Sequence, residues 1–178
     1  TSRRQRQMCI RDRSYPEVRT YIRDQFVNLI KTKYPQVELI AGVATGAIAQ
    51  GALVAQELGL PFVYVRSAAK NHGLENLIEG EYKEGQKVVV VEDLISTGGS
   101  SLQAVEALRN AGCDVLGMVA IFTYGFQKAI DNFTNAHCVL DTLSDYNAMI
   151  DLAQKTGYVQ ESDVAKLKEW RLSPESYK

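Results

Sequence analysis

The chain has 178 residues, of which 46% are hydrophobic and 23% charged, and its formal net charge at pH 7 is −1. This composition indicates one globular domain with a sizeable core. The near-neutral charge gives no reason to expect a nucleic acid or a membrane surface as a partner, and no apolar run is long enough to span a membrane. The three cysteines, Cys9, Cys113 and Cys138, have neither disulfide nor zinc-site spacing, which favours free thiols in a reducing cytoplasm.

Residues 1–13 differ in composition from the rest of the chain. They are rich in arginine and contain few residues that could be buried. A basic arm for nucleic acid is one interpretation. We favour a foreign or disordered leader, followed by a single domain that covers residues 14–178.

From residue 14 onward, β-branched runs alternate with amphipathic segments. Ser14 and Glu17 have the spacing of a capping box, which predicts a helix that ends before Pro35. The alternation predicts βαβ units with right-handed crossovers, and therefore an α/β fold. The expected strands are 37–41, 62–65, 87–91, 115–122 and 137–140. The further expected helices are 47–58, 101–109, 127–133, 142–156 and a last one capped by Ser162.

One stretch carries the strongest functional pattern. Val88–Val91 is uniformly apolar, which predicts a central strand covered on both faces. Glu92 and Asp93 follow at its carboxyl end, where open α/β sheets place ligands. The small, hydroxyl-rich loop 96–100 then runs into a helix, and such a helix N-terminus suits a phosphate. Because carboxylates accept hydrogen bonds from sugar hydroxyls, the combination predicts a site for a ribose 5-phosphate unit. An ordinary strand–turn–helix connection is the alternative.

Two further segments could bind a second anionic group. Thr45-Gly46 lies in another small-residue loop that opens a helix, although a plain tight turn explains this pattern equally well. Arg66, Lys70 and His72 follow the strand 62–65, in a segment to residue 85 that lacks core periodicity. A long, charged loop in a compact domain is either functional or disordered. Together these cations and amides could hold a pyrophosphate.

The stretch 88–100, Val-Val-Val-Val-Glu-Asp-Leu-Ile-Ser-Thr-Gly-Gly-Ser, resembles the 5-phosphoribosyl 1-pyrophosphate (PRPP) signature of the type I phosphoribosyltransferases. Within that group it is most similar to the orotate phosphoribosyltransferases. The similarity extends from about Ser14 to the C-terminus. It implies a type I phosphoribosyltransferase-like α/β fold, in which helices flank a central parallel sheet and the N-terminal hood segment is incomplete in this chain.

The resemblance also implies an activity. In that family the 5-phosphoribosyl group passes from PRPP to orotate, which gives orotidine 5′-monophosphate and pyrophosphate for UMP synthesis. By resemblance, Lys70, His72 and Asp93 are the catalytic residues, and Ser96 contacts orotate. The residues implied to bind PRPP are Thr45, Gly46, Arg66, Lys70, His72, Glu92, Asp93, Leu94, Ile95, Ser96, Thr97, Gly98, Gly99 and Ser100.

The family's cofactor and assembly follow from the same resemblance. Mg²⁺ bridges the pyrophosphate and the ribose hydroxyls, and an ion held by substrate oxygens needs few protein ligands, so we expect no dedicated protein metal site. Arg66, Lys70 and His72-Gly73 match a loop that reaches into the neighbouring subunit's site. We therefore expect a homodimer with shared active sites.

The chain departs from the family pattern at several points. Ser67 stands where many members have a second lysine, Thr45-Gly46 where some have a lysine, and 123–125 where some have an arginine. No residue of 1–13 matches the lysine and aromatic residues that surround orotate in the family. We therefore expect this chain to bind PRPP but to turn over slowly.

Other functions fit the sequence less well. A phosphoribosyltransferase for another base shares the PRPP pattern, but the Arg-x-x-x-Lys-x-His-Gly loop favours orotate. A non-catalytic regulator that binds PRPP would need an attached nucleic-acid-binding element. A dinucleotide-binding dehydrogenase lacks its G-x-G-x-x-G motif, and a Walker NTPase lacks its Gly-Lys-Ser/Thr motif.

Overall fold

The computed structural model describes residues 14–66 and 77–174. The leader expected at 1–13 lies outside these residues. None of the helices formed by the described residues is long and apolar enough to cross a membrane.

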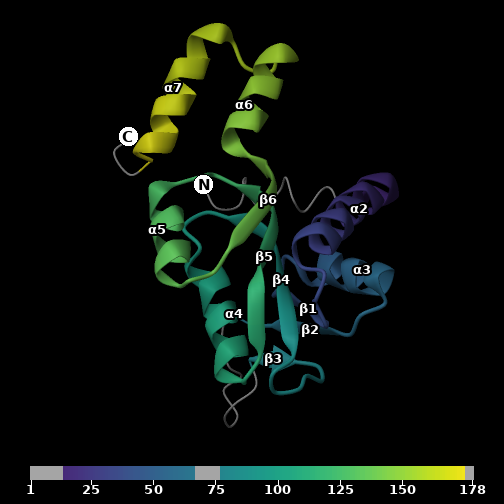
Figure 1. Ribbon diagram of the computed structural model, residues 1–178. Coiled ribbons are helices and arrows are strands. Elements are labelled where there is room, and N and C mark those ends of the chain that lie inside the picture. The colour runs from purple at the N-terminus through teal and green to yellow at the C-terminus, as the bar shows by residue number, and fades with distance from the viewer. Residues whose placement is uncertain (1–13, 67–76, 175–178) are drawn as a thin grey trace.

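Within the described ranges, six strands form one sheet in the order β3-β2-β1-β4-β5-β6 (Figure 1). Neighbouring strands are parallel, except that β3 runs antiparallel to β2. The expected central parallel sheet is confirmed. The strands are β1 (Leu39–Val43), β2 (Phe62–Val65), β3 (Ile78–Glu79), β4 (Lys87–Ile95), β5 (Asp114–Thr123) and β6 (Leu140–Asp145).

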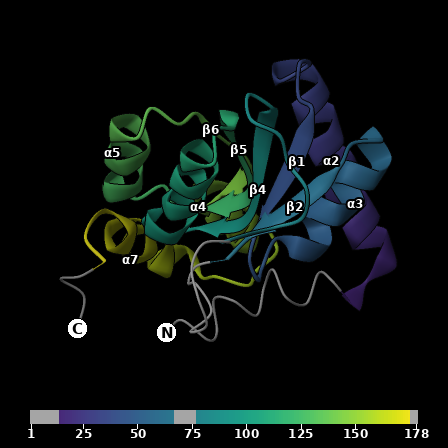
Figure 2. The ribbon, with the colours of Figure 1, turned by 90° about the horizontal axis from the view of Figure 1, so that it is seen from below.

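Helices cover both faces of this sheet, as Figure 2 shows from below. α2 and α3 pack on one face, α4 and α5 on the other. α6 and α7 follow β6 and extend beyond the end of the sheet (Figure 1). The helices are α2 (Pro16–Lys33), α3 (Ile48–Leu58), α4 (Gly99–Asn110), α5 (Gln127–Asn135), α6 (Tyr146–Lys155) and α7 (Glu161–Leu172).

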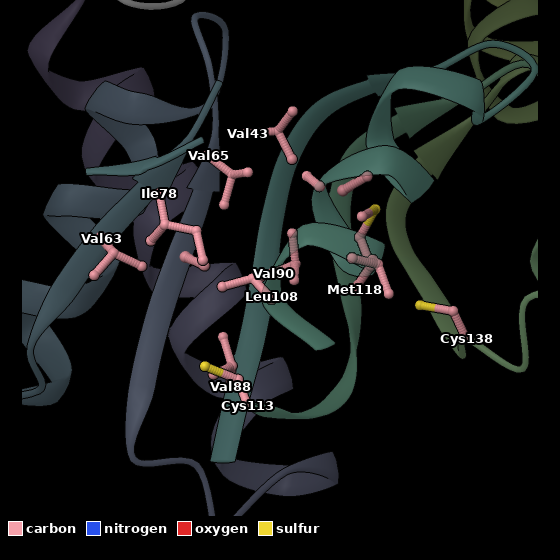
Figure 3. Close-up of a cluster of buried hydrophobic side chains, with 14 of the residues drawn as sticks. Val43, Val63, Val65, Ile78, Val88, Val90, Leu108, Cys113, Met118 and Cys138 are labelled. Carbon is pink, nitrogen blue, oxygen red and sulfur yellow. The ribbon is translucent and has the colours of Figure 1, made fainter. Parts of the chain in front are cut away.

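The valine run of β4 is buried on both sides, as its composition predicts. Because side chains alternate along a strand, Val88 and Val90 join the core beneath α4, whereas Val89 and Val91 join the core beneath α2 and α3. All four are fully buried. Figure 3 shows Val88 and Val90 in the first of these cores, close to Leu108 of α4.

Several element boundaries differ from those expected. Ser14 does not cap α2, since Tyr15 occupies the N-cap position and makes no capping hydrogen bond through its side chain. The edge strand expected at 137–140 is β6, and the helix expected from Thr142 begins only at Tyr146. The Asp145 side chain accepts a hydrogen bond from the N–H of Ala148 and so caps α6, which a helix starting at Thr142 would prevent.

Two more differences bear on the ends of elements. Gln160, and not Ser162, occupies the N-cap position of α7. β4 continues through Asp93 to Ile95, because β5 pairs with it along its whole length. Glu92 and Asp93 therefore lie within the last part of the strand instead of after it.

Candidate active site

Loop 96–98 joins β4 to α4 and presents backbone N–H groups at a helix N-terminus. Gly98 occupies the N-cap position with φ +80°, in the left-handed region. Because glycine has no side chain, α4 has no side-chain cap. Ser96, Gly99 and Ser100 are exposed. Since the first N–H groups of a helix have no intrahelical acceptor, this loop can hold a phosphate.

Helix α5 supports the loop from behind. The amide Nδ2 of Asn132 donates a hydrogen bond to the backbone oxygen of Thr97 at 2.9 Å. The ring of Phe133 lies where a side chain on Gly98 would project, with its Cε2 atom 2.6 Å from an ideal Cβ. Sequence reasoning missed both supporting residues, because nothing in their local pattern indicates which loop they reach.

Glu92 points into the protein. Its side chain is 5% exposed. Oε1 accepts a hydrogen bond from the N–H of Asp93, and Oε2 accepts one from Oγ of Ser101, both at 2.8 Å. Burial, together with the charge of Asp93, raises the pKa of Glu92 well above its ordinary value. The structure therefore places this carboxylate at the junction of β4 and α4.

Asp93 lies on the other side of the strand, against the small-residue loop that contains Thr45 and Gly46. A Cβ added to Gly46 would overlap the Asp93 carboxylate, so the glycine is what allows the two to approach. Asp93 is half-buried. The structure thus brings together two segments that are distant in the sequence.

The first small-residue loop is held to its neighbouring strand. The N–H of Ala44 donates to the oxygen of Val65 at 2.8 Å, and the peptide bond between Ala44 and Thr45 is cis. α3 begins directly afterwards, at Ile48, with no capping hydrogen bond from its N-cap side chain. Because β1 and β4 are parallel neighbours, both small-residue loops lie at the same edge of the sheet.

Arg66 follows β2 at that edge. Its Nη1 atom donates to Oε1 of Glu79 in β3 at 3.1 Å, an ion pair that sequence reasoning missed. The N–H of Arg66 donates to the oxygen of Leu77 at 2.7 Å, so these two residues lie side by side. Lys70 and His72 lie outside the described residues.

Leu94 and Ile95 are committed to packing. Ile95 is fully buried in the core beneath α4, and Leu94 packs against the aromatic cluster around Tyr124. Their side chains face the protein, so only their backbone could take part in binding PRPP.

The C-terminal helix closes the same end of the sheet. Nη1 of Arg171 donates to the oxygen of Gly125 at 3.0 Å, and Tyr124 stacks on Phe126 with ring centroids 5.2 Å apart. A cavity of about 480 Å³ is lined by Thr97 of loop 96–98 and by Arg171 of α7, among others. Residues 123–125, where the sequence departs from the resembled family, thus contact α7.

Comparisons with known proteins agree on one family. Residues 13–151 match the model of the phosphoribosyl transferase domain. Orotate phosphoribosyltransferase of Bacteroides thetaiotaomicron is 60% identical over 161 residues, which cover 90% of this chain and 76% of that protein. The protein of the same name from Porphyromonas gingivalis is 60% identical over 164 residues, covering 92% of this chain and 78% of that protein.

The chain belongs to the orotate phosphoribosyltransferase family. A solved structure agrees: orotate phosphoribosyltransferase from Aeropyrum pernix superposes with a TM-score of 0.72 at 25% identity, covering 82% of this chain and 80% of that one. The type I phosphoribosyltransferase fold expected from the sequence is confirmed.

For this orotate phosphoribosyltransferase family member, the structure brings Asp93, loop 96–100 and Thr45-Gly46 to one edge of the sheet, with Arg66 following the strand beside them. Their roles toward a ligand stay predictions. Among the site residues that the structure describes, Glu92 is buried, and its carboxyl group accepts a hydrogen bond from Ser101 instead of facing the open side of the loop.

Replacing Gly98 tests the geometry of loop 96–98. We expect Gly98→Ala to lower the free energy of unfolding by about 2 kcal/mol, because alanine resists a positive φ and its Cβ would press on Phe133. Gly99→Ala is the matched control, since a Cβ there meets no atom within 4 Å. Urea unfolding checks both variants, and equal stability of the two would contradict this account of Gly98.

The buried acid also predicts a pH dependence of stability. Burial raises the pKa of Glu92 in the folded chain to about 8, from 4.5 when exposed. The folded chain therefore keeps a proton on Glu92 that the unfolded chain releases. Because release of this proton favours the unfolded chain, the free energy of unfolding falls as the pH rises from about 4.5 to about 8.

Glu92→Gln removes this titration. Across that range we expect the unfolding free energy of the wild type to fall relative to that of Glu92→Gln, by about 1.4 kcal/mol for each unit by which folding raises the pKa of Glu92. Urea unfolding at several pH values measures the difference. Parallel pH profiles for the two proteins would show that Glu92 does not titrate in this way.

Proposed function

We propose that this chain transfers the 5-phosphoribosyl group of PRPP to N1 of orotate, which gives orotidine 5′-monophosphate and pyrophosphate. The observation that carries the proposal is the position of Asp93 at the end of β4, against Gly46 and shortly before the amide-rich loop 96–100. This arrangement occurs in a chain that is 60% identical to curated orotate phosphoribosyltransferases over nine-tenths of its length.

The three parts of PRPP have separate places at this edge of the sheet. The 5-phosphate would accept hydrogen bonds from the N–H groups of loop 96–100 and of the first turn of α4. The ribose hydroxyls would donate to the carboxylate of Asp93. Its half-buried position against Gly46 supports this role, because it sets the acid between the two anion-binding loops.

The pyrophosphate would lie at the Thr45-Gly46 loop, within reach of cationic side chains. Arg66 comes from the neighbouring strand, and although one of its nitrogens binds Glu79, a guanidinium has five N–H donors. We propose that Lys70 and His72 supply further positive charge. Ser96, exposed at the start of the loop, would contact orotate.

We propose Mg²⁺ as the cofactor. Pyrophosphate and diol oxygens are the hard donors that this ion prefers, so an ion carried by PRPP itself needs few protein ligands. In the part of the chain that the structure describes, no group of three or more His, Cys, Asp or Glu side chains could hold a metal ion. When bound, Mg²⁺ neutralises negative charge on the pyrophosphate.

The residues of the chain act by position and charge. Departure of pyrophosphate leaves positive charge on the ribose ring, and the carboxylate of Asp93 stabilises that charge while it holds the hydroxyls. Lys70, His72 and Arg66 stabilise the departing pyrophosphate. No side chain has to act as a nucleophile, because N1 of orotate attacks the ribose carbon directly.

We also propose that the enzyme acts in the cytoplasm. Cys113 and Cys138 are free and buried, and burial raises the pKa of both thiols, which keeps them protonated and unreactive. Free thiols of this kind suit a reducing compartment.

Titration calorimetry with PRPP and Mg²⁺, followed by orotate, tests the proposed function together with an assay of orotidine 5′-monophosphate. We expect Asp93→Asn to weaken PRPP binding about tenfold or more, because an amide accepts weaker hydrogen bonds from the hydroxyls. Lys70→Ala should slow turnover and leave PRPP affinity nearly unchanged. A wild-type chain that does not bind PRPP, or that uses another base equally well, would contradict the proposal.

The expected homodimer has its own test. If Lys70 acts in the partner's site, an equimolar mixture of Lys70→Ala and Asp93→Asn chains forms mixed dimers with one intact site each. Such a mixture should regain about a quarter of wild-type activity, as random pairing in a two-fold dimer requires. No recovery after remixing, with dimers present by sedimentation, would mean that each subunit uses its own Lys70.

A further inference from the structure

We propose that Ser101 is a positioning residue for this reaction: its hydroxyl holds the Glu92 carboxylate, and Glu92 holds the strand position from which Asp93 meets the ribose. The inference rests on the proposed function for the identity of the ligand. It assigns different roles to the two acids of the pair, with Asp93 facing the ligand and Glu92 supporting it.

Glu92 contacts both Ser101 and the backbone of Asp93. Ser101 is 2% exposed and lies in the first turn of α4, and its Oγ donates to Oε2 of Glu92 at 2.8 Å. The other carboxylate oxygen, Oε1, accepts the N–H of Asp93 at 2.8 Å. One side chain thus links the helix that carries the phosphate loop to the backbone of the acid that follows it.

The direction of the Asp93 side chain depends on how Glu92 is held. Successive side chains of a strand point to opposite faces, so fixing Glu92 on one face sets the direction of Asp93 on the other. The Asp93 carboxylate lies against Gly46, in the space that the Cβ of any other residue at position 46 would occupy. A small shift of the Asp93 backbone would therefore move its carboxylate relative to both anion-binding loops.

Asp93 and Ser101 also act on the ionisation of Glu92. Asp93 is the titratable neighbour whose negative charge acts on Glu92, and it raises the pKa of Glu92, whereas the hydrogen bond from Ser101 lowers that pKa. Without the Ser101 hydroxyl, burial and Asp93 would favour the protonated form of Glu92 still more. The Ser101 contact thus acts on the ionisation of Glu92 as well as on its position.

Titration calorimetry of PRPP and Mg²⁺ on the full chain tests this role with four variants. We expect Ser101→Ala to weaken PRPP binding about tenfold, and Ser101→Thr, which keeps the hydroxyl, to bind within about threefold of the wild type. Glu92→Gln should also stay within about threefold, because its amide can still accept from Asp93 and bond to Ser101. Glu106→Gln, an exposed acid on α4, is the matched control and should bind normally.

A second measurement separates positioning from mere stability. Carbon NMR of the Glu92 carboxyl in the ligand-free chain should show its midpoint moving to higher pH in Ser101→Ala and returning in Ser101→Thr. Urea unfolding of the same variants shows whether they fold. A variant that only loses stability would keep the affinity for PRPP and the Glu92 midpoint of the wild type.

Three results would overturn the inference. Ser101→Ala could fold and bind PRPP like the wild type, or it could leave the Glu92 midpoint unmoved. Glu92→Gln could lose as much affinity as Asp93→Asn, which would place Glu92 on the ligand itself. A wild-type chain that fails to bind PRPP would instead overturn the proposed function, so the two failures are distinguishable.

Discussion

The structure depends on the burial of β4 on both faces. Its alternating valines enter two separate cores, one beneath α2 and α3 and one beneath α4, so the strand is held from both sides. Burial of each such side chain contributes on the order of 1.5–3 kcal/mol. A strand fixed in this way gives the residues at its carboxyl end one defined position. The positions of Glu92, Asp93 and loop 96–98 therefore depend on how β4 is packed.

The two acids at the end of β4 differ in surroundings although they are adjacent in sequence. Glu92 is buried and bonded to Ser101, whereas Asp93 is half-buried and lies against Gly46. The pleat of the strand separates them, and the contact with α4 then makes one of them internal. An acidic pair in such a motif therefore need not act as two equivalent ligands.

The C-terminal helix changes the meaning of one departure from the family pattern. Tyr124 stands in a cluster with Phe126, Tyr146 and Trp170, and Arg171 donates to the oxygen of Gly125. The end of β5 is thus the place where α7 packs. This contact brings α7, which follows the residues matched by the family model, against the same end of the sheet as loop 96–98.

The sequence by itself determined the α/β class, the central position of the valine strand and the small-residue loop that joins this strand to a helix. These features are readable because each depends on a local pattern: β-branched residues favour a buried strand, and glycines allow the turn before a helix. The boundaries of β6 and α6 were wrong, since pairing with β5 and the Asp145 cap decide them.

Only the tertiary structure decided which groups meet at the site. The approach of Asp93 to Gly46, the bond from Ser101 to Glu92, and the support of Thr97 by Asn132 all join residues from different elements. Their distances follow from how helices and strands pack, and no local pattern encodes that packing.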